Sequence, residues 1–287
     1  MALWNYLKAR KFSIEVFGIS RSSALHFLTC DLSSRRQLKK ILEQIQPNVI
    51  FHLAGGKPAD ENALWQANFI STKILFDTVA ELKGISPCII IPGSAAEYGK
   101  VKTPQKPVSE KLQPQPLAWY GFVKYIQTSL GLMYARQGLD VRIARIFNIG
   151  GYGTPSSLAL GNFAKKIVQI ERGKELPVLK VGQLTSQRDF IDIEDVCSAL
   201  WAIARKGKKG EVYNVCSGEL LSMRFLIREL ISHSNVEITL KEEQQTRSAT
   251  FDIAGSNIKI RRVTSWRPRV SLEQSLKNTL RYYRELS

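Results

Sequence analysis

Two apolar runs separated by a helical stretch constrain the fold of this chain more than any other feature. Val49–Ala54 is apolar apart from His52, and Cys88–Ile91 is apolar throughout. The segment between them, from about Asn62 to Leu82, has the length and apolar spacing of a helix. Strands without regular polar alternation are typical of parallel sheets that are buried on both faces. The pattern therefore predicts a β-α-β unit.

The same alternation continues on both sides of this unit. Upstream, the sequence predicts strands over Ile14–Ile19 and Leu25–Cys30 and a helix over Ser34–Ile45. Downstream, it predicts a helix from about Trp119 to Arg136 and a strand over Asp140–Ile146. Strands that alternate with helices in this way predict an α/β fold with a doubly wound, Rossmann-like parallel sheet.

Beyond Asn148, loops rich in Gly, Pro and Ser connect shorter elements. We expect helices near 161–171, 195–205, 222–232 and 271–285 and strands near 177–181 and 211–215. The change predicts two domains, a Rossmann-like domain over residues 1–150 and a smaller substrate-binding lobe over residues 151–287. A chain of 287 residues that is 44% hydrophobic can bury a core in each.

A candidate proton-transfer site combines Ser94 with Tyr120 and Lys124. The tyrosine and the lysine are four residues apart in a predicted helix, so they share one face. A cation within ~4–6 Å favours the phenolate, so we expect Lys124 to lower the Tyr120 pKa from ~10. Ser94, at the end of the preceding strand, adds a hydroxyl that can hold the reacting oxygen. Tyr98 and Lys102 have the same spacing but lie in a loop bounded by Gly and Pro, which favours Tyr120.

The net charge of +16 raises the question of a nucleic-acid partner. The basic residues are scattered and form only short doublets, such as Arg35-Arg36 and Lys165-Lys166, so we expect no nucleic acid. A compact polyanion, such as a dinucleotide or a nucleoside diphosphate, is the better match.

Compartment and cysteine usage add two expectations. No apolar run approaches the ~18–20 residues needed to span a bilayer, and the first residues do not resemble a signal peptide, so we expect a cytoplasmic protein without a membrane partner. The cysteines have no paired spacing, so we assign neither a disulfide nor a metal site to Cys30, Cys88, Cys197 and Cys216.

These segments together resemble the extended short-chain dehydrogenase/reductase family, or NAD-dependent epimerase/dehydratase family, in its branch that modifies nucleotide sugars. The resemblance covers essentially the whole chain, and six motifs occur in family order: Cys30-Asp31-Leu32, Phe51-His-Leu53-Ala54-Gly55, Asn68, Ser94 with Tyr120 and Lys124, Arg145-Ile-Phe-Asn148-Ile-Gly150, and Arg188-Asp-Phe-Ile-Asp192.

The resemblance implies a cofactor site. The residues that would bind the cofactor are Asp31, Leu32, Leu53, Ala54, Gly55, Asn68, Tyr120 and Lys124, with Asp31 at the adenine ring. Two alternatives stay open, because Asp31 could cap the following helix and His52 is more often a packed histidine than a catalytic one. We give His52 no role in proton transfer.

The resemblance also implies a catalytic trio of Ser94, Tyr120 and Lys124. Ser94, Asn148 and Arg188 would bind the sugar nucleotide. Two alternatives again remain, since Asn148 could be a turn former and Arg188 could pair with a neighbouring aspartate.

The start of the chain departs from the family pattern. Members carry a first strand and a Gly-x-x-Gly-x-x-Gly turn that holds the pyrophosphate, whereas Leu3–Arg10 already reads as the middle of the following helix. We expect a sheet that lacks its first strand. Either the true start lies upstream, or the chain is a truncated relative with a damaged cofactor site.

Arg21 follows the second expected strand of the family, where a basic residue would accept the 2′-phosphate of NADP(H) and a carboxylate would favour NAD(H). The dehydratases of this branch carry an acid two residues after the motif hydroxyl, where this chain has Ala96. Glu97 is one residue further on and should point the other way if the segment is extended. The resemblance therefore implies NADP(H)-dependent reduction of a 4-keto group on a nucleotide-diphosphate 6-deoxy-hexose, with a GDP-sugar favoured.

Two rival functions remain at this stage. One is a nucleotide-sugar 4-epimerase that retains NAD, and the other is a non-catalytic nucleotide-binding relative. As in the family, a homodimer is expected through the helices near 62–82 and 119–136, with Leu130, Met133 and Tyr134 adding apolar area.

Overall fold

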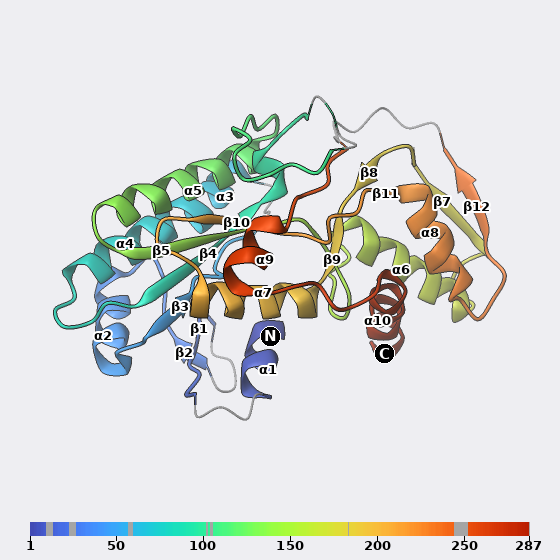
Figure 1. Cartoon of the computed structure of the whole chain (residues 1–287). Helices are drawn as coiled ribbons and strands as arrows, with labels where there is room; N and C mark the ends of the chain where they lie inside the picture. Colours follow the sequence, from blue (N-terminus) through green and yellow to red (C-terminus); the bar gives the residue numbers. More distant parts are fainter. Residues whose placement is uncertain are drawn as a thin grey trace.

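The computed structural model describes residues 1–9, 14–22, 27–56, 60–101, 103, 106–182, 184–243 and 252–286. Its largest sheet has four parallel strands in the order β10-β5-β4-β3 (Figure 1). The strands are β3 (Val49–Phe51), β4 (Cys88–Ser94), β5 (Asp140–Ile146) and β10 (Val212–Val215). Ile89, Ile90 and Ile91 in β4 are fully buried, as expected for an apolar strand covered on both faces.

Two further strands form a separate parallel pair, β1 (Gly18–Ser20) with β2 (Phe27–Thr29). Within the described residues, no ladder joins this pair to the four-stranded sheet. In a doubly wound sheet of order 3-2-1-4-5-6, the first strand lies between the second and the fourth. β1 and β2 take the places of the second and third strands, and β3 that of the fourth. The Rossmann-like prediction is confirmed, and among the described residues the ladder is interrupted between β1 and β3.

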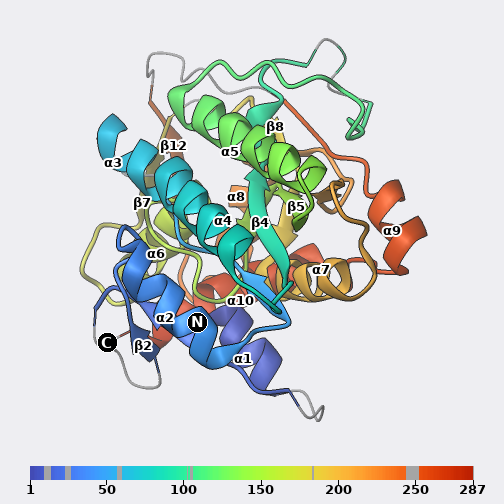
Figure 2. The same ribbon diagram turned by 90° about the vertical axis from the view of Figure 1, so that its left-hand side faces the viewer.

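Helices cover both faces of the four-stranded sheet (Figure 2). One layer holds α2 (Arg35–Ile45), α4 (Ser71–Glu81) and α5 (Trp119–Arg136), and the other holds α1 (Ala2–Lys8), α7 (Ile193–Lys206) and α9 (Ile258–Thr264). Each layer packs on its own apolar core, which includes Leu38, Phe76 and Tyr134 on one side and Leu3, Ile203 and Ile260 on the other. This two-sided cover is the doubly wound arrangement.

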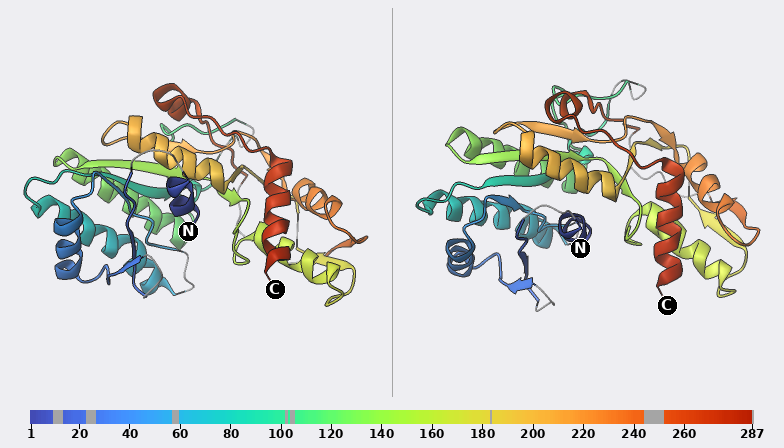
Figure 3. Two further views of the ribbon diagram at one scale, coloured as in Figure 1. Left: turned by 90° about the horizontal axis from the view of Figure 1, so that it is seen from below. Right: turned by 60° about the horizontal axis from the view of Figure 1, so that its bottom comes forward.

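The C-terminal lobe packs three helices against a two-stranded parallel sheet (Figure 3). These elements are α6 (Ala159–Glu171), α8 (Met223–Ser232), α10 (Leu272–Glu285), β7 (Val178–Val181) and β12 (Thr239–Glu242). Two short pairs complete the described strands: β6 (Asn148–Gly150) with β9 (Phe190–Asp192), and β8 (Gln187–Arg188) with β11 (Leu221–Ser222). β10 lies beyond residue 150 and yet pairs with β5, so the chain returns to the main sheet from the second half of the sequence.

Several expected elements differ in extent from the structure. The strand expected over Val49–Ala54 ends at Phe51, and the strand expected over Ile14–Ile19 forms a described ladder only from Gly18 onward. Leu25 and His26, the start of the next expected strand, lie outside the described residues. The helix expected from Asn62 to Leu82 is interrupted by a π-helical turn (Gln66–Ile70) between α3 (Glu61–Trp65) and α4.

None of the helices in the described ranges is long and apolar enough to cross a membrane.

Candidate active site

Ser94 and Tyr120 meet at the carboxyl edge of the sheet. Ser94 is the last residue of β4, and Tyr120 lies in the first turn of α5. The Ser94 side chain hydrogen-bonds the Tyr120 phenol. Gly121 makes this approach possible, because a Cβ at that position would collide with the backbone oxygen of Ala96. The helix can therefore begin directly against the end of the strand.

Tyr120 favours the neutral phenol. Burial raises the pKa of Tyr120; the Ser94 hydrogen bond opposes this shift, and the negative charge of Glu97 adds to it. The prediction that Lys124 lowers this pKa is wrong, because the i, i+4 spacing fixes a shared helix face but not the direction in which the ammonium points.

Lys124 is buried and donates a hydrogen bond to Oε1 of Gln127, one turn further along α5. Gln127 Nε2 in turn donates to Thr72 Oγ1 at 2.8 Å. Burial lowers the pKa of Lys124 to about 8, and the charge of Glu97 opposes that shift. The ammonium is thus held by a buried amide whose other end is anchored on α4.

His52 joins the same network from the strand side. Its Nε2 lies 3.0 Å from Thr72 Oγ1. Thr72 donates its one hydroxyl hydrogen to the backbone oxygen of Asn68, so it must accept a hydrogen bond from His52, which fixes the Nε2–H tautomer. Burial lowers the pKa of His52 to about 4, and the charge of Lys124 contributes. The ring is therefore neutral at pH 7, as a packed histidine would be.

Glu97 is a buried residue of the site, and the expectation that it points the other way is wrong. The segment Ala95–Glu97 is a 3₁₀ turn rather than an extended strand, so the carboxylate folds back and accepts from the backbone N–H of Ser94 at 2.7 Å. The Ser94 hydroxyl in turn accepts from Ala96 N, which completes a capping box. The Ser-x-x-Glu spacing is the sequence signature of that motif and could have revealed it.

The first group of predicted cofactor residues follows β1 and β2. Arg21 and Asp31 are both exposed there, and Leu32 packs against the core of the α2, α4 and α5 layer. Hydrogen bonds from Ser33 lower the pKa of Asp31, and the charge of Arg21 lowers it further. Ser34, not Asp31, is the cap of α2, so the helix-cap alternative for Asp31 is wrong.

The second group surrounds the end of β3. Leu53 is 46% exposed and Ala54 follows it. Gly55 has a φ of +139°, and a Cβ there would lie 2.7 Å from Asn68 Oδ1. Asn68 is buried in the π-helical turn and donates to the backbone oxygen of Gly56 at 3.1 Å. It therefore fastens the loop that follows β3.

The predicted substrate residues lie at the junction of β6, β8 and β9. Asn148 Nδ2 donates to the backbone oxygen of Asp189 at 2.9 Å. Arg188 Nε is buried and has no hydrogen-bond partner among the described residues, and burial lowers the pKa of Arg188. Among the described residues, the guanidinium of Arg188 therefore forms no ion pair with Asp189.

Asp189 instead organises the surrounding loops. Its fully buried carboxylate accepts from Ser217 N and Gly218 N, both at 2.9 Å, from Ser217 Oγ at 2.7 Å and from Gly255 N at 3.1 Å. Burial raises the pKa of Asp189 to about 6, against these donors. Asp189 belongs to the Arg188–Asp192 motif, but its role could not be predicted from the sequence, since its donors lie about 30 and 65 residues away.

Of the alternative pair, the structure describes only the tyrosine. Tyr98 is buried and donates to Asn214 Oδ1 at 2.8 Å, while Lys102 lies outside the described residues.

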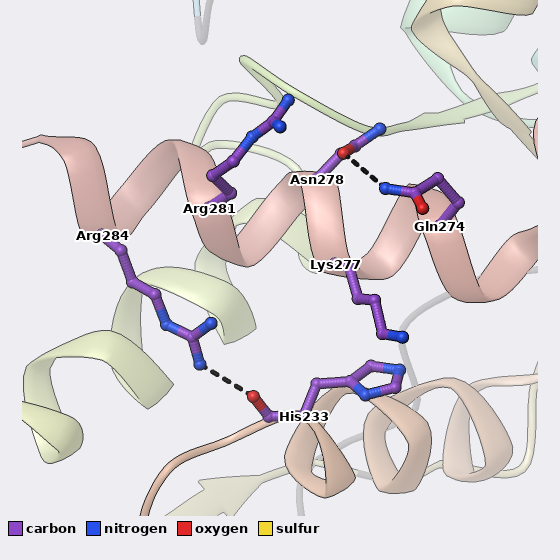
Figure 4. A pocket seen from close by; sticks show the side chains of 6 residues that line it. All are labelled: His233, Gln274, Lys277, Asn278, Arg281 and Arg284. Carbon is purple, nitrogen blue, oxygen red and sulfur yellow. Dashed lines mark hydrogen bonds between the residues drawn. The ribbon is translucent and has the colours of Figure 1, made fainter.

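A separate hollow on α10 contains none of the predicted site residues (Figure 4). Its cations each pair with an acid: Lys277 with Glu273, Arg281 with Glu285 and Arg284 with Glu171. The four cysteines are buried free thiols.

A serine, a tyrosine and a lysine at the carboxyl edge of a doubly wound parallel sheet define an oxidoreductase of the short-chain type. The sequence model described as "NAD dependent epimerase/dehydratase family" matches residues 1–216, and the chain belongs to this family.

Similar proteins of known name act on nucleotide sugars. The GDP-6-deoxy-D-mannose reductase of Pseudomonas aeruginosa is 31% identical over 242 residues, which cover 82% of this chain and 79% of that protein. The GDP-6-deoxy-D-talose 4-dehydrogenase of Aggregatibacter actinomycetemcomitans is 26% identical over 242 residues, covering 83% and 78%. The structure of RMD from Pseudomonas aeruginosa complexed with NADPH matches with a TM-score of 0.88 and 28% identity, covering 99% of this chain and 95% of that one. These relatives are oxidoreductases that act on nucleotide sugars.

The site fits two parts of a dinucleotide cofactor. Arg21 and Asp31, exposed after β1 and β2, suit the adenosine end. Leu53, Tyr120 and Lys124, at the carboxyl ends of β3 and β4, suit the nicotinamide end. No Gly-x-x-Gly-x-x-Gly run occurs in the sequence, so the described residues offer no such turn for the pyrophosphate.

Proposed function

We propose that the protein reduces the 4-keto group of a nucleotide-diphosphate 6-deoxy-4-keto-hexose with NADPH, and that the nucleotide is GDP. The observation that carries this proposal is the contact of Ser94 with Tyr120 at the carboxyl edge of the sheet, which places a phenol that is protonated at pH 7 beside a hydroxyl that can hold the reacting oxygen. Reduction of a ketone needs a proton donor at the oxygen when the hydride arrives. The likeness to the Pseudomonas aeruginosa reductase supports the choice of sugar and base.

In this mechanism each residue of the trio has one task. Bound NADPH supplies the hydride that adds to C4. Tyr120 gives its proton to the developing alkoxide, and Ser94 hydrogen-bonds the same oxygen. Lys124 carries the positive charge of the site and is assigned the ribose of the cofactor. Asn148 and Arg188 are assigned the sugar nucleotide.

The preference for NADP(H) over NAD(H) rests on Arg21. It is exposed directly after β1, where a basic side chain can meet the 2′-phosphate. The NADPH in the Pseudomonas aeruginosa structure is in accord with this choice.

A 4-epimerase, which would retain NAD, is the weaker candidate because Arg21 favours NADP(H). A non-catalytic nucleotide-binding relative of the fold is the third candidate.

We further propose a homodimer through α5 and the helix formed by α3 and α4. Trp119, Phe122 and Met133 leave apolar surface exposed on α5, and the first two stack at a centroid distance of 5.4 Å. The expected contribution of Leu130 and Tyr134 is wrong, because both are buried in the core of the protomer itself.

The direct test mixes the protein with a GDP-6-deoxy-4-keto-hexose and NADPH and follows the loss of NADPH absorbance. We expect stoichiometric oxidation of NADPH, with slower turnover of the dTDP or UDP sugar and with NADH. Interconversion of 4-hydroxy sugars without added cofactor would instead identify an epimerase. Absence of dinucleotide binding in calorimetry would identify the non-catalytic alternative.

A further inference from the structure

A carboxylate that the proposed reaction does not use lies directly beneath the catalytic residues. Glu97 has no exposed surface and sits on the turn that follows β4. Its Oε1 accepts from Ser94 N at 2.7 Å and from Thr128 Oγ1 at 3.1 Å. Its Oε2 accepts from Arg145 Nε at 3.0 Å and from Nη2 at 2.8 Å. One side chain therefore holds β4, α5 and β5 at a single point.

These three elements carry the proposed reaction. Ser94 ends β4, Tyr120 and Lys124 lie on α5 with Thr128, and β5 leads from Arg145 to Asn148. The backbone N–H of Ser94 donates a hydrogen bond to the Glu97 carboxylate. A movement of Glu97 therefore moves the hydroxyl of Ser94 with it. Thr128 ties the same carboxylate to the helix one turn beyond Lys124.

The surroundings are shaped for an ionised glutamate. Gly93 leaves room for it, since a Cβ there would lie 2.6 Å from Glu97 Oε1. Burial raises the pKa of Glu97, and the charge of Arg145 opposes that shift. Oε2 faces two N–H groups of Arg145, and Oε1 accepts from Ser94 N and Thr128 Oγ1, so the donors around the carboxylate suit its ionised form. Arg145 is itself held over the Tyr98 ring at 4.5 Å.

We propose that Glu97, paired with Arg145, is a positioning residue that fixes Ser94 against Tyr120 and whose buried charge keeps the site ready to donate a proton. The direction of proton transfer in this proposal rests on the proposed function, whereas the positioning of Ser94 by Glu97 does not. The direction of two charge effects supports it: Glu97 raises the pKa of Tyr120 and also raises that of Lys124. Both effects favour a protonated site.

The test replaces the ion pair with uncharged residues of similar size, Glu97→Gln with Arg145→Met, so that no unpaired charge is buried. The matched control is Glu171→Gln with Arg284→Met, a Glu–Arg pair of the C-terminal lobe in which Glu171 is 7% exposed. Thr128→Val is a milder variant that removes one donor to Glu97 and keeps the volume, and it serves if the double variant does not fold.

The first readout needs no substrate. Ring-labelled tyrosine is titrated by NMR, with the Tyr120 signal identified by its loss in Tyr120→Phe. We expect the Tyr120 pKa to fall in the Glu97 double variant, to fall less in Thr128→Val and to stay unchanged in the control. An unchanged Tyr120 pKa in folded Glu97 variants would overturn the charge part of the proposal.

The second readout is turnover. We expect kcat to fall on the order of 10–100-fold with a smaller change in KM, and the loss of rate at high pH to begin at a lower pH. Ser94→Ala should cost less in the Glu97 variant than in the wild type, because the two residues act through one position. Additive losses, or an equal loss in the control, would overturn the positioning role. A wild-type protein that does not reduce the keto sugar would refute the proposed function and leave the NMR result to stand alone.

Discussion

The proposed catalytic lysine should destabilise the fold at neutral pH. Lys124 is 4% exposed and donates to Gln127. Burial lowers its pKa from 10.5 to about 8. The ammonium is therefore less favourable in the folded chain than in the unfolded chain, where it is hydrated. Replacing Lys124 with Met keeps the length of the side chain and removes the charge.

The size of the effect follows from the shift. A difference of 10.5 against about 8 corresponds to about 3 kcal/mol at 1.36 kcal/mol per pKa unit. Above pH 8 the folded protein loses this proton while the unfolded chain keeps it until pH 10.5, so the stability of the wild type rises with pH across that window. Lys124→Met has no such gain. Loss of the hydrogen bond to Gln127 costs the variant about 1–3 kcal/mol at every pH, which leaves the pH dependence as the clean signal.

The assay is urea unfolding of both proteins between pH 7 and pH 10. We expect the wild type to gain about 2–3 kcal/mol relative to Lys124→Met over this interval, and all other titrating groups to cancel in the difference. Lys39→Met, at an exposed lysine of α2, is the control and should show no such change. A difference between wild type and Lys124→Met that does not change with pH would refute the assignment of a buried, destabilised ammonium.

Three further predictions concern the proposed reaction. Tyr120→Phe should lower keto-sugar reduction on the order of 10²–10⁴-fold and leave nucleotide-sugar binding nearly intact, because it removes one proton donor and little volume; wild-type turnover in this variant would contradict the assignment. Arg21→Asp should shift the preference from NADPH toward NADH, measured as the ratio of kcat/KM for the two cofactors, and an unchanged ratio would place the 2′-phosphate elsewhere. Light scattering at micromolar concentration should give the mass of a dimer, and Met133→Glu should lower it, whereas a monomeric wild type would refute the proposed interface.

The alternation of strands and helices was predictable because each element carries its own local signal. The apolar run of Cys88–Ile91 became the buried centre of β4, and the helix expected from Trp119 to Arg136 is α5 with the same bounds. The limits of β1 were not predictable, since a strand ends where its partner ends. Likewise β10 joins β5 although about 70 residues separate them, which no local pattern indicates.

The positions of the candidate site residues were predictable, but their electrostatics were not. Sequence spacing placed Tyr120 and Lys124 on one face of α5, and Ser94 was expected beside them at the end of the preceding strand. Spacing could not reveal that the Lys124 ammonium turns to Gln127, because the bond depends on Thr72 from another helix. Spacing also could not reveal that Arg145 pairs with Glu97, because 48 residues separate the two in sequence.

The trio of serine, tyrosine and lysine does not by itself decide the direction of a reaction. By microscopic reversibility the same tyrosine gives its proton to an alkoxide in a reduction and takes a proton from a hydroxyl in an oxidation, and it serves both steps best with a pKa near the working pH. The pKa of Tyr120 is set below the trio, where burial and the charge of Glu97 raise it and the ammonium of Lys124 is bound to Gln127. Substitutions in this buried layer are therefore expected to change the pKa of Tyr120 with Ser94, Tyr120 and Lys124 left as they are.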